Sequence, residues 1–117
     1  MLNGESFEAR AAELLEARGL RIIARRYRCR LGEIDLVALD DQRLVFVEVR
    51  ARRHASHGGA AASVDRRKQC KLARCAAHFL RSQPQWRNLS CRFDVVAWQA
   101  TTDGCMEARW LKSAFTP

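Results

Sequence analysis

The stretch GEIDLVALDDQRLVFVEVR, residues 32–50, decides the fold of this chain. It contains two apolar runs rich in Val, Leu and Ile, which are separated by the turn-prone segment 40–43. Apolar and polar side chains alternate along much of both runs, as they do in strands with two different faces. The stretch therefore predicts a β-hairpin.

Pairing the two strands across the turn fixes the register, so that Asp35 faces Glu48 and Glu33 faces Arg50. One predicted face is wholly apolar and comprises Ile34, Leu36, Ala38, Val45, Val47 and Val49. The other is apolar near the turn and ionic at its open end, and comprises Glu33, Asp35, Val37, Leu39, Leu44, Phe46, Glu48 and Arg50.

The opposed acids Asp35 and Glu48 require a positive charge between them, because like charges directly across two strands destabilise a sheet. Arg50 could supply that charge, which would make the group a purely structural ion-pair cluster. A hard divalent ion such as Mg²⁺ is the functional alternative, since proteins usually bind it through one or two carboxylates together with substrate phosphate.

Other periodic segments surround the hairpin. Helices are predicted over residues 4–18 and 66–82, capped by Asn3 and Asp65 respectively. Strands are predicted at residues 20–30, 91–99 and 106–112, and residues 51–63 form an Arg- and His-rich loop or lid. The order αβββαββ predicts a single α/β domain over residues 1–117, with a mixed sheet flanked by helices.

Two polar residues interrupt the apolar helix faces. Glu8 lies at the edge of the stripe formed by Phe7, Ala11, Leu14 and Leu15 in the first helix. Gln69 falls on the apolar face of the second helix, near its start. Either is more often a satisfied interior polar group than a functional one. Both are nevertheless predicted to meet the acids of the hairpin at one end of the sheet.

The charge balance favours a polyanionic partner. Lys and Arg number 21 against 13 acids, which gives a formal charge of +8 and a pI near 10.1. Guanidinium groups contact phosphates in pairs, so nucleic acid is preferred over a merely well-solvated basic surface. No apolar run is long enough for a spanning helix or a signal peptide, which predicts a cytoplasmic protein without a membrane partner.

The cysteines are predicted to be reduced thiols. They form an odd set of five without a CxxC pair, namely Cys29, Cys70, Cys75, Cys91 and Cys105. A zinc site that combines His54 and His57 with a cysteine is the weaker alternative, because too few ligands lie nearby in the sequence.

The ordered motifs resemble those of a known nuclease superfamily. Asp35 followed by Glu48-Val49-Arg50 is similar to the core pattern of the restriction-endonuclease-like PD-(D/E)xK nucleases. Within this superfamily the chain resembles the YraN-like family, small uncharacterised bacterial proteins similar to archaeal Holliday junction resolvases. The matching motifs are Glu8, GEIDLV (32–37), VFVEVR (45–50), GGAAASV (58–64), KQ (68–69), RFDVVA (92–97) and AF (114–115).

The resemblance implies a metal site for Mg²⁺ or Mn²⁺. It places Asp35, Glu48 and the Val49 carbonyl at metal-ligand positions, with Glu8 as an accessory acid and Gln69 as a residue that orients phosphate or water. Arg50 departs from the family pattern, which has lysine there. Arginine stays protonated and can only stabilise charge, so general-base work at Arg50 is excluded.

Three functions follow as hypotheses. The first is a metal-dependent nuclease that hydrolyses phosphodiester bonds in branched or otherwise structured DNA. The second is a non-catalytic nucleic-acid-binding module that retains the nuclease fold, and the third is a protein-interaction domain that uses exposed Trp residues. The resemblance to resolvases makes a homodimer an open alternative to a monomer. The candidate nucleic-acid contacts are Arg28, Arg52, Arg53, Lys68 and Lys71.

Overall fold

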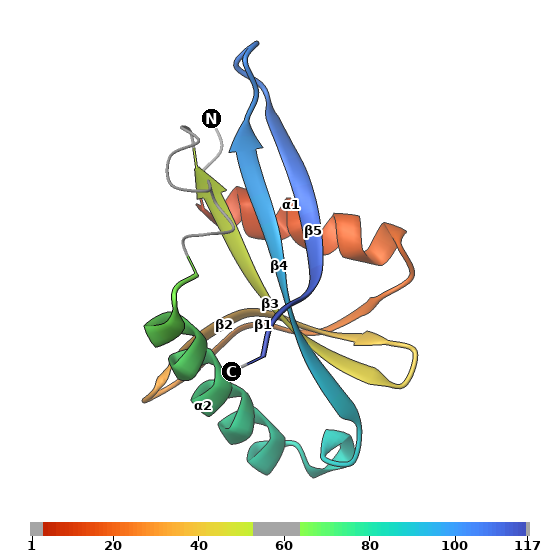
Figure 1. Cartoon of the computed structure of the whole chain (residues 1–117). Helices are drawn as coiled ribbons and strands as arrows, with labels where there is room; N and C mark the ends of the chain where they lie inside the picture. Colours follow the sequence, from red (N-terminus) through yellow and green to blue (C-terminus); the bar gives the residue numbers. More distant parts are fainter. Residues whose placement is uncertain (1–3, 53–63, 117) are drawn as a thin grey trace.

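The predicted hairpin is part of one five-stranded sheet (Figure 1). The computed structural model describes residues 4–52 and 64–116, with the backbone alone for residues 4–6. The elements are α1 (Gly4–Ala17), β1 (Arg21–Cys29), β2 (Gly32–Asp40), β3 (Arg43–Arg52), α2 (Arg66–Ser82), the 3-10 helix η2 (Pro84–Trp86), β4 (Ser90–Ala100) and β5 (Met106–Phe115). The predicted α/β class and the order αβββαββ are confirmed.

The strands lie in the order β1-β2-β3-β4-β5, so neighbours in sequence are also neighbours in space. β3 and β4 are parallel, whereas the other pairs are antiparallel. A parallel pair needs a crossover connection, and α2 lies within the segment that joins β3 to β4. The predicted mixed sheet is therefore confirmed.

Helix α1 covers one face of the sheet. Its alanines Ala11 and Ala12 and its Leu15 are fully buried, because small side chains allow the helix to approach the strands closely. They pack in a cluster with Leu20, Leu36, Ala38, Val45, Val47, Val96 and Trp98. Phe7 adds a tilted ring contact with Trp98, at 5.6 Å between centroids.

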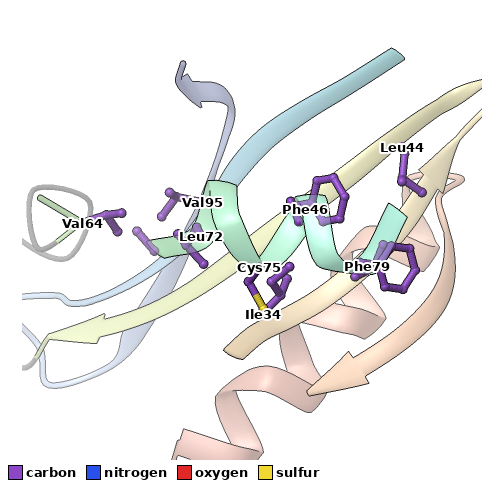
Figure 2. Close-up of a cluster of buried hydrophobic side chains, with 11 residues drawn as sticks. Ile34, Leu44, Phe46, Val64, Leu72, Cys75, Phe79 and Val95 are labelled. Atoms are coloured by element: carbon purple, nitrogen blue, oxygen red, sulfur yellow. The ribbon is translucent and has the colours of Figure 1, made fainter. Parts of the chain in front are cut away.

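Helix α2 covers the opposite face (Figures 1 and 2). Its buried residues Leu72, Cys75, Ala76 and Phe79 follow the helical spacing that the sequence predicts. They contact Ile34, Val37, Leu44, Phe46, Val64, Val95 and Ala97. Phe79 meets Phe46 edge to face, and this contact lies at the centre of the cluster.

The helix ends agree with the capping residues. The side chain of Asp65 accepts the backbone N–H of Lys68 at 2.9 Å, which confirms the predicted N-cap and the range 66–82. Gly19 follows α1 with φ +94°, a conformation that glycine adopts readily. The other predicted cap, Asn3, lies outside the described residues. No helix within the described ranges is long and apolar enough to cross a membrane.

The hairpin register is confirmed near the turn and changes at the open end. The paired residues run from Asp40 with Arg43 to Leu36 with Val47, as predicted. Beyond this point β2 stays paired with β1 and β3 with β4, so the two strands of the hairpin separate. Strict alternation is lost there, and Ile34 joins the cluster beneath α2 rather than the face covered by α1 (Figure 2). The predicted face of Ile34 is therefore wrong.

The predicted pair of Glu33 with Arg50 is also wrong, for the same reason. Glu33 is paired with Arg28 across β1 and β2, and their side chains form an exposed ion pair at 3.5 Å. Arg50 instead approaches Glu48 on its own strand. The separation of β2 from β3 leaves room between them for a pocket.

Candidate functional site

A pocket of about 420 Å³ lies where β2 and β3 separate. It is lined by Glu8 of α1, Gly32, Glu33 and Asp35 of β2, Glu48, Val49 and Arg50 of β3, and Lys68, Lys71 and Leu72 of α2. Four carboxylate side chains and three basic side chains therefore line one pocket between the two helices. The structure brings together most of the residues that the sequence singled out.

The acids Asp35 and Glu48 are hydrogen-bonded to each other within this pocket. Oδ2 of Asp35 also accepts the backbone N–H of Val49 at 2.7 Å, which fixes the carboxyl group against β3. Glu48 is only 5% exposed. Burial, followed by the hydrogen bond and charge of Glu48, raises the pKa of Asp35 to about 8. Asp35 therefore holds its proton at neutral pH unless a cation replaces it.

Glu8 reaches the same pocket from α1. Its Oε2 accepts a hydrogen bond from Nε of Arg26 at 3.0 Å. Burial, and to a lesser extent the charge of Asp35, raises the pKa of Glu8 despite the opposing effect of Arg26. The sequence did not predict the role of Arg26, since β1 carries several arginines and nothing in the spacing shows which of them meets α1.

Arg50 supplies a positive charge beside the acid pair. Its Nη2 lies 3.5 Å from Oε2 of Glu48, and its side chain is 21% exposed. Among the described residues, its buried Nε has no hydrogen-bond partner. The guanidinium therefore offsets the negative charge of Glu48, while its Nε donor makes no hydrogen bond to the described residues.

The first turns of α2 supply two lysines. Lys68 is half-buried and Lys71 is exposed, and both line the pocket beside Leu72. Asp65 caps this end of the helix and accepts the backbone N–H of Lys68. The two lysines add two positive charges to the pocket that contains the carboxylates.

Gln69 does not join the acids. Its side chain lines a second cavity of about 420 Å³ with Val64, Val95, Trp110, Leu111, Lys112, Ala114 and Phe115. Its Nε2 donates to the carbonyl of Val64 at 3.1 Å. Successive helix residues point about 100° apart, so Gln69 faces β4 and β5 while Lys68 faces the pocket. The structure assigns it a local contact at the start of α2.

The remaining predicted nucleic-acid contacts are spread over the surface. Arg28 is exposed on β1, and Arg52 is exposed at the end of β3, two residues beyond Arg50. Arg53 lies outside the described residues, as do His54, His57 and most of the predicted lid.

One buried acid lies outside the pocket. Asp94 is fully buried and accepts hydrogen bonds from Arg92 Nε at 3.0 Å, Trp110 Nε1 at 2.9 Å and Ser113 N at 2.9 Å. These bonds fasten β5 to β4. The sequence contains a signal for it, because an acid within the apolar strand RFDVVA must find partners when buried.

The donor set of the pocket suits a hard cation. The protonated carboxyl group of Asp35 would release its proton to a divalent ion, which prefers oxygen ligands and retains several waters. In the described part of the chain, no three His, Cys, Asp or Glu side chains form a metal-binding group. Asp35 and Glu48 would therefore supply two side-chain ligands beside the backbone carbonyl of Val49, and water and substrate oxygens would fill the remaining positions.

The family model of UPF0102, an uncharacterised protein family, matches residues 7–98. A UPF0102 protein of Pseudomonas putida strain GB-1 is 49% identical over 112 residues, covering 96% of this chain and 91% of the relative. UPF0102 proteins of Pseudomonas entomophila strain L48 and Alcanivorax borkumensis strain SK2 are 50% and 46% identical over the same length.

Among solved structures, a calcium complex of Pyrococcus furiosus SfsA is similar, with a TM-score of 0.41 and 16% identity. The match covers 93% of this chain and 62% of that one. The family model and the curated relatives confirm the resemblance that the sequence motifs indicated. The chain therefore belongs to the uncharacterised protein family UPF0102, the YraN-like family.

Proposed function

We propose that this protein is a metal-dependent nuclease that hydrolyses phosphodiester bonds in DNA. The observation that supports the proposal most directly is the hydrogen-bonded pair of Asp35 and Glu48 in a pocket that also contains Arg50, Lys68 and Lys71. Carboxylates bind the cation and basic side chains bind phosphate, so the pocket contains both halves of a phosphodiesterase site.

Mg²⁺ or Mn²⁺ is the proposed cofactor. Asp35, Glu48 and the backbone carbonyl of Val49 would hold the ion, with Glu8 as an outer acid. When bound, such an ion lowers the pKa of a coordinated water and neutralises charge on the scissile phosphate. Glu8 accepts a hydrogen bond from Arg26, which favours a supporting role rather than direct coordination.

The side chains of this protein position the reactants. The N–H of Val49 fixes the Asp35 carboxyl group, which lines the pocket. Arg50, whose side chain is 21% exposed, stabilises negative charge that develops on a phosphate oxygen. Lys68 and Lys71 bind the phosphates from the opposite wall and can donate a proton to the leaving oxygen.

DNA is the proposed substrate because of the charge of the whole chain. The formal charge of +8 raises the local concentration of a polyanion around the pocket. The preference for branched or otherwise structured DNA rests on the resemblance to Holliday junction resolvases. Dimerisation, which would bring two sites to two strands, is part of the same proposal.

A non-catalytic nucleic-acid-binding module is the second candidate. The observation in its favour is the ion pair between Arg50 and Glu48, which places an arginine where nucleases of the superfamily have lysine. Such a module would bind DNA through Arg28, Arg52 and the lysines of α2, and would not require the metal.

The decisive experiment is cleavage of end-labelled four-way, forked, linear and single-stranded DNA with Mg²⁺ or Mn²⁺. The Asp35→Asn/Glu48→Gln variant should lose metal-dependent cleavage while retaining its fold. Glu16→Gln is the matched control, since Glu16 is an exposed acid of α1 outside the pocket. Cleavage that persists in the double variant contradicts the nuclease proposal, and metal-independent binding without cleavage supports the second candidate.

A further inference from the structure

The sulfur atoms of Cys29 and Cys75 lie 3.3 Å apart. Cys29 ends β1 and Cys75 lies in the middle of α2, so the two thiols join segments that are distant in the sequence. A disulfide requires a sulfur separation of about 2.05 Å, which small side-chain rotations can supply from this distance. We propose that Cys29 and Cys75 form a reversible intramolecular disulfide when the protein meets a hydroperoxide.

The two thiols differ in the way that such a reaction requires. Cys29 is partly exposed, whereas Cys75 is fully buried and belongs to the cluster beneath α2 that Figure 2 shows. Desolvation opposes ionisation of Cys29. Hydrogen bonds from Cys75 and from the backbone N–H groups of Leu31 and Gly32, together with the charge of Arg30, nevertheless lower its pKa. Burial and the neighbouring Cys29 raise the pKa of Cys75 to about 12. Cys29 is therefore the thiol that reacts first.

The other thiols have no comparable neighbour. Cys70, Cys91 and Cys105 are exposed, and each is free. Cys91 contacts the carbonyl of Leu89 at 3.7 Å, and burial raises its pKa. Within the described residues no second sulfur contacts any of these three, so oxidation should select the Cys29–Cys75 pair.

The reaction balances in two steps. The thiolate of Cys29 attacks one oxygen of the hydroperoxide, the O–O bond breaks, and the leaving oxygen takes a proton to form water or an alcohol. Cys29 becomes a sulfenic acid. The thiol of Cys75 then attacks this sulfur, an S–S bond forms, the S–O bond breaks, and the hydroxyl group leaves as water with the proton of Cys75. A thiol reductant reverses the result.

The disulfide would tie β1 to α2, the helix that supplies Lys68, Lys71 and Leu72 to the pocket with Asp35 and Glu48. Cys75 lies one helical turn after Lys71, and Cys29 precedes the turn that leads to Gly32. The cross-link spans 46 positions in the sequence and restricts the separation of β1 from α2. Only its consequence for DNA binding rests on the proposed function, whereas formation of the bond does not.

The test is titration of the reduced protein with hydrogen peroxide, followed by thiol labelling and peptide mass spectrometry. We expect the five free thiols to fall to three, with the Cys29 and Cys75 peptides joined and two hydrogens lost. The melting temperature should rise by roughly 5 °C or more and return with dithiothreitol. Cross-links among the exposed cysteines, or no cross-link at all, would overturn the proposal.

Two single-cysteine substitutions test the oxidation of Cys29 separately from disulfide formation, in proteins that are expected to fold. Cys75→Ala leaves Cys29 without a partner, so its sulfenic acid should be trapped by dimedone in a folded protein. An unlabelled Cys29 in that variant would overturn the proposal. Cys91→Ser is the matched control and should form the Cys29–Cys75 bond at the rate of the unaltered protein. These results do not depend on DNA cleavage. They therefore test the disulfide even if the nuclease assay detects no activity.

Discussion

The Asp35 carboxyl group on β2 accepts the backbone N–H of Val49 on β3 at 2.7 Å, beyond the last paired residues of the two strands. The Asp35 side chain therefore connects β2 to β3 at the point where the two strands begin to separate. The same carboxyl group is hydrogen-bonded to Glu48. The acid pair is therefore held by the hairpin itself, and both acids remain available to a ligand that enters between the strands.

Without metal, the protein should lose stability as the pH rises. Asp35 has an ordinary pKa of 3.8 but titrates at about 8 in the folded state, so folding binds a proton between these values. Its contribution is fully present below pH 4 and is lost by pH 8. Asp35→Asn imitates the protonated form. In EDTA this variant should be more stable than the unaltered protein by on the order of 5 kcal/mol at pH 9, and equal to it at pH 4.

Asp41→Asn is the control for this pH series. Asp41 is an exposed turn residue with φ +57°, a conformation that asparagine adopts well. Its effect on the free energy of unfolding should be small and nearly constant with pH. A pH-independent effect of Asp35→Asn, measured by urea unfolding, would show that the pKa of Asp35 is not raised in the folded protein.

Metal binding should depend on the same two acids. Isothermal calorimetry with Mn²⁺ at pH 7.5 should detect one ion per chain in the unaltered protein and none in Asp35→Asn/Glu48→Gln, while Glu16→Gln binds normally. Binding should release protons, because the ion displaces the proton that Asp35 holds. Heats measured in two buffers of different ionisation enthalpy test this. Equal binding by the double variant would remove the basis of the metal site.

Local patterns predicted the elements well because they act over short distances. The period of the hairpin and its turn fixed the register from Asp40 to Leu36, and Asp65 fixed the start of α2. The prediction was wrong where the register depends on other strands. Ile34 changes face because β2 stays paired with β1 while β3 stays paired with β4. The sequence of the hairpin alone does not show that these outer pairings replace the pairing of β2 with β3 at its open end.

The site was predictable as a set of acids but not as a pocket. The spacing indicated that Asp35, Glu48 and Glu8 would meet, since hairpin register and helix phase are both local. Gln69 was placed wrongly, because the tilt of α2 over the sheet decides which residue of its first turn faces β2 and which faces β5. The contact between Cys29 and Cys75 depends on the same packing, so no spacing rule could reveal it.

Arg50→Lys should raise cleavage if the protein is a nuclease. Lysine can release a proton, whereas arginine remains charged, so the variant regains a group that can assist the attacking water. We expect cleavage of forked DNA by the variant to increase roughly tenfold or more at pH 8 to 9. Arg109→Lys, an exposed change on β5 outside the pocket, should have no effect. If neither protein cleaves, the binding-module candidate gains support.

Asp94→Asn should destabilise the fold without touching the pocket. Arg92 is only 9% exposed, and it would lose the acid that its Nε contacts. Ser113 and Trp110 would compete for a single amide oxygen. We expect a loss of about 3–5 kcal/mol in the free energy of unfolding, measured with urea. Glu107→Gln on exposed β5 is the control, and a similar loss there would argue against a specific role for Asp94.

The lysines of α2 should contribute to DNA binding through phosphate contacts. Lys68 and Lys71 line the pocket opposite the acids, whereas Lys112 lies over the ring of Trp110 at 4.6 Å, on β5. Each phosphate contact releases counterions, so Lys68→Ala or Lys71→Ala should reduce the slope of log affinity against log salt by about 0.9. Fluorescence anisotropy with labelled forked DNA between 50 and 200 mM salt, about the range over which such contacts are weakened, measures the slope. Lys112→Ala is the matched control. If it lowers the slope as much as the α2 variants do, DNA does not approach through this pocket, and the phosphate contacts belong to another face of the sheet.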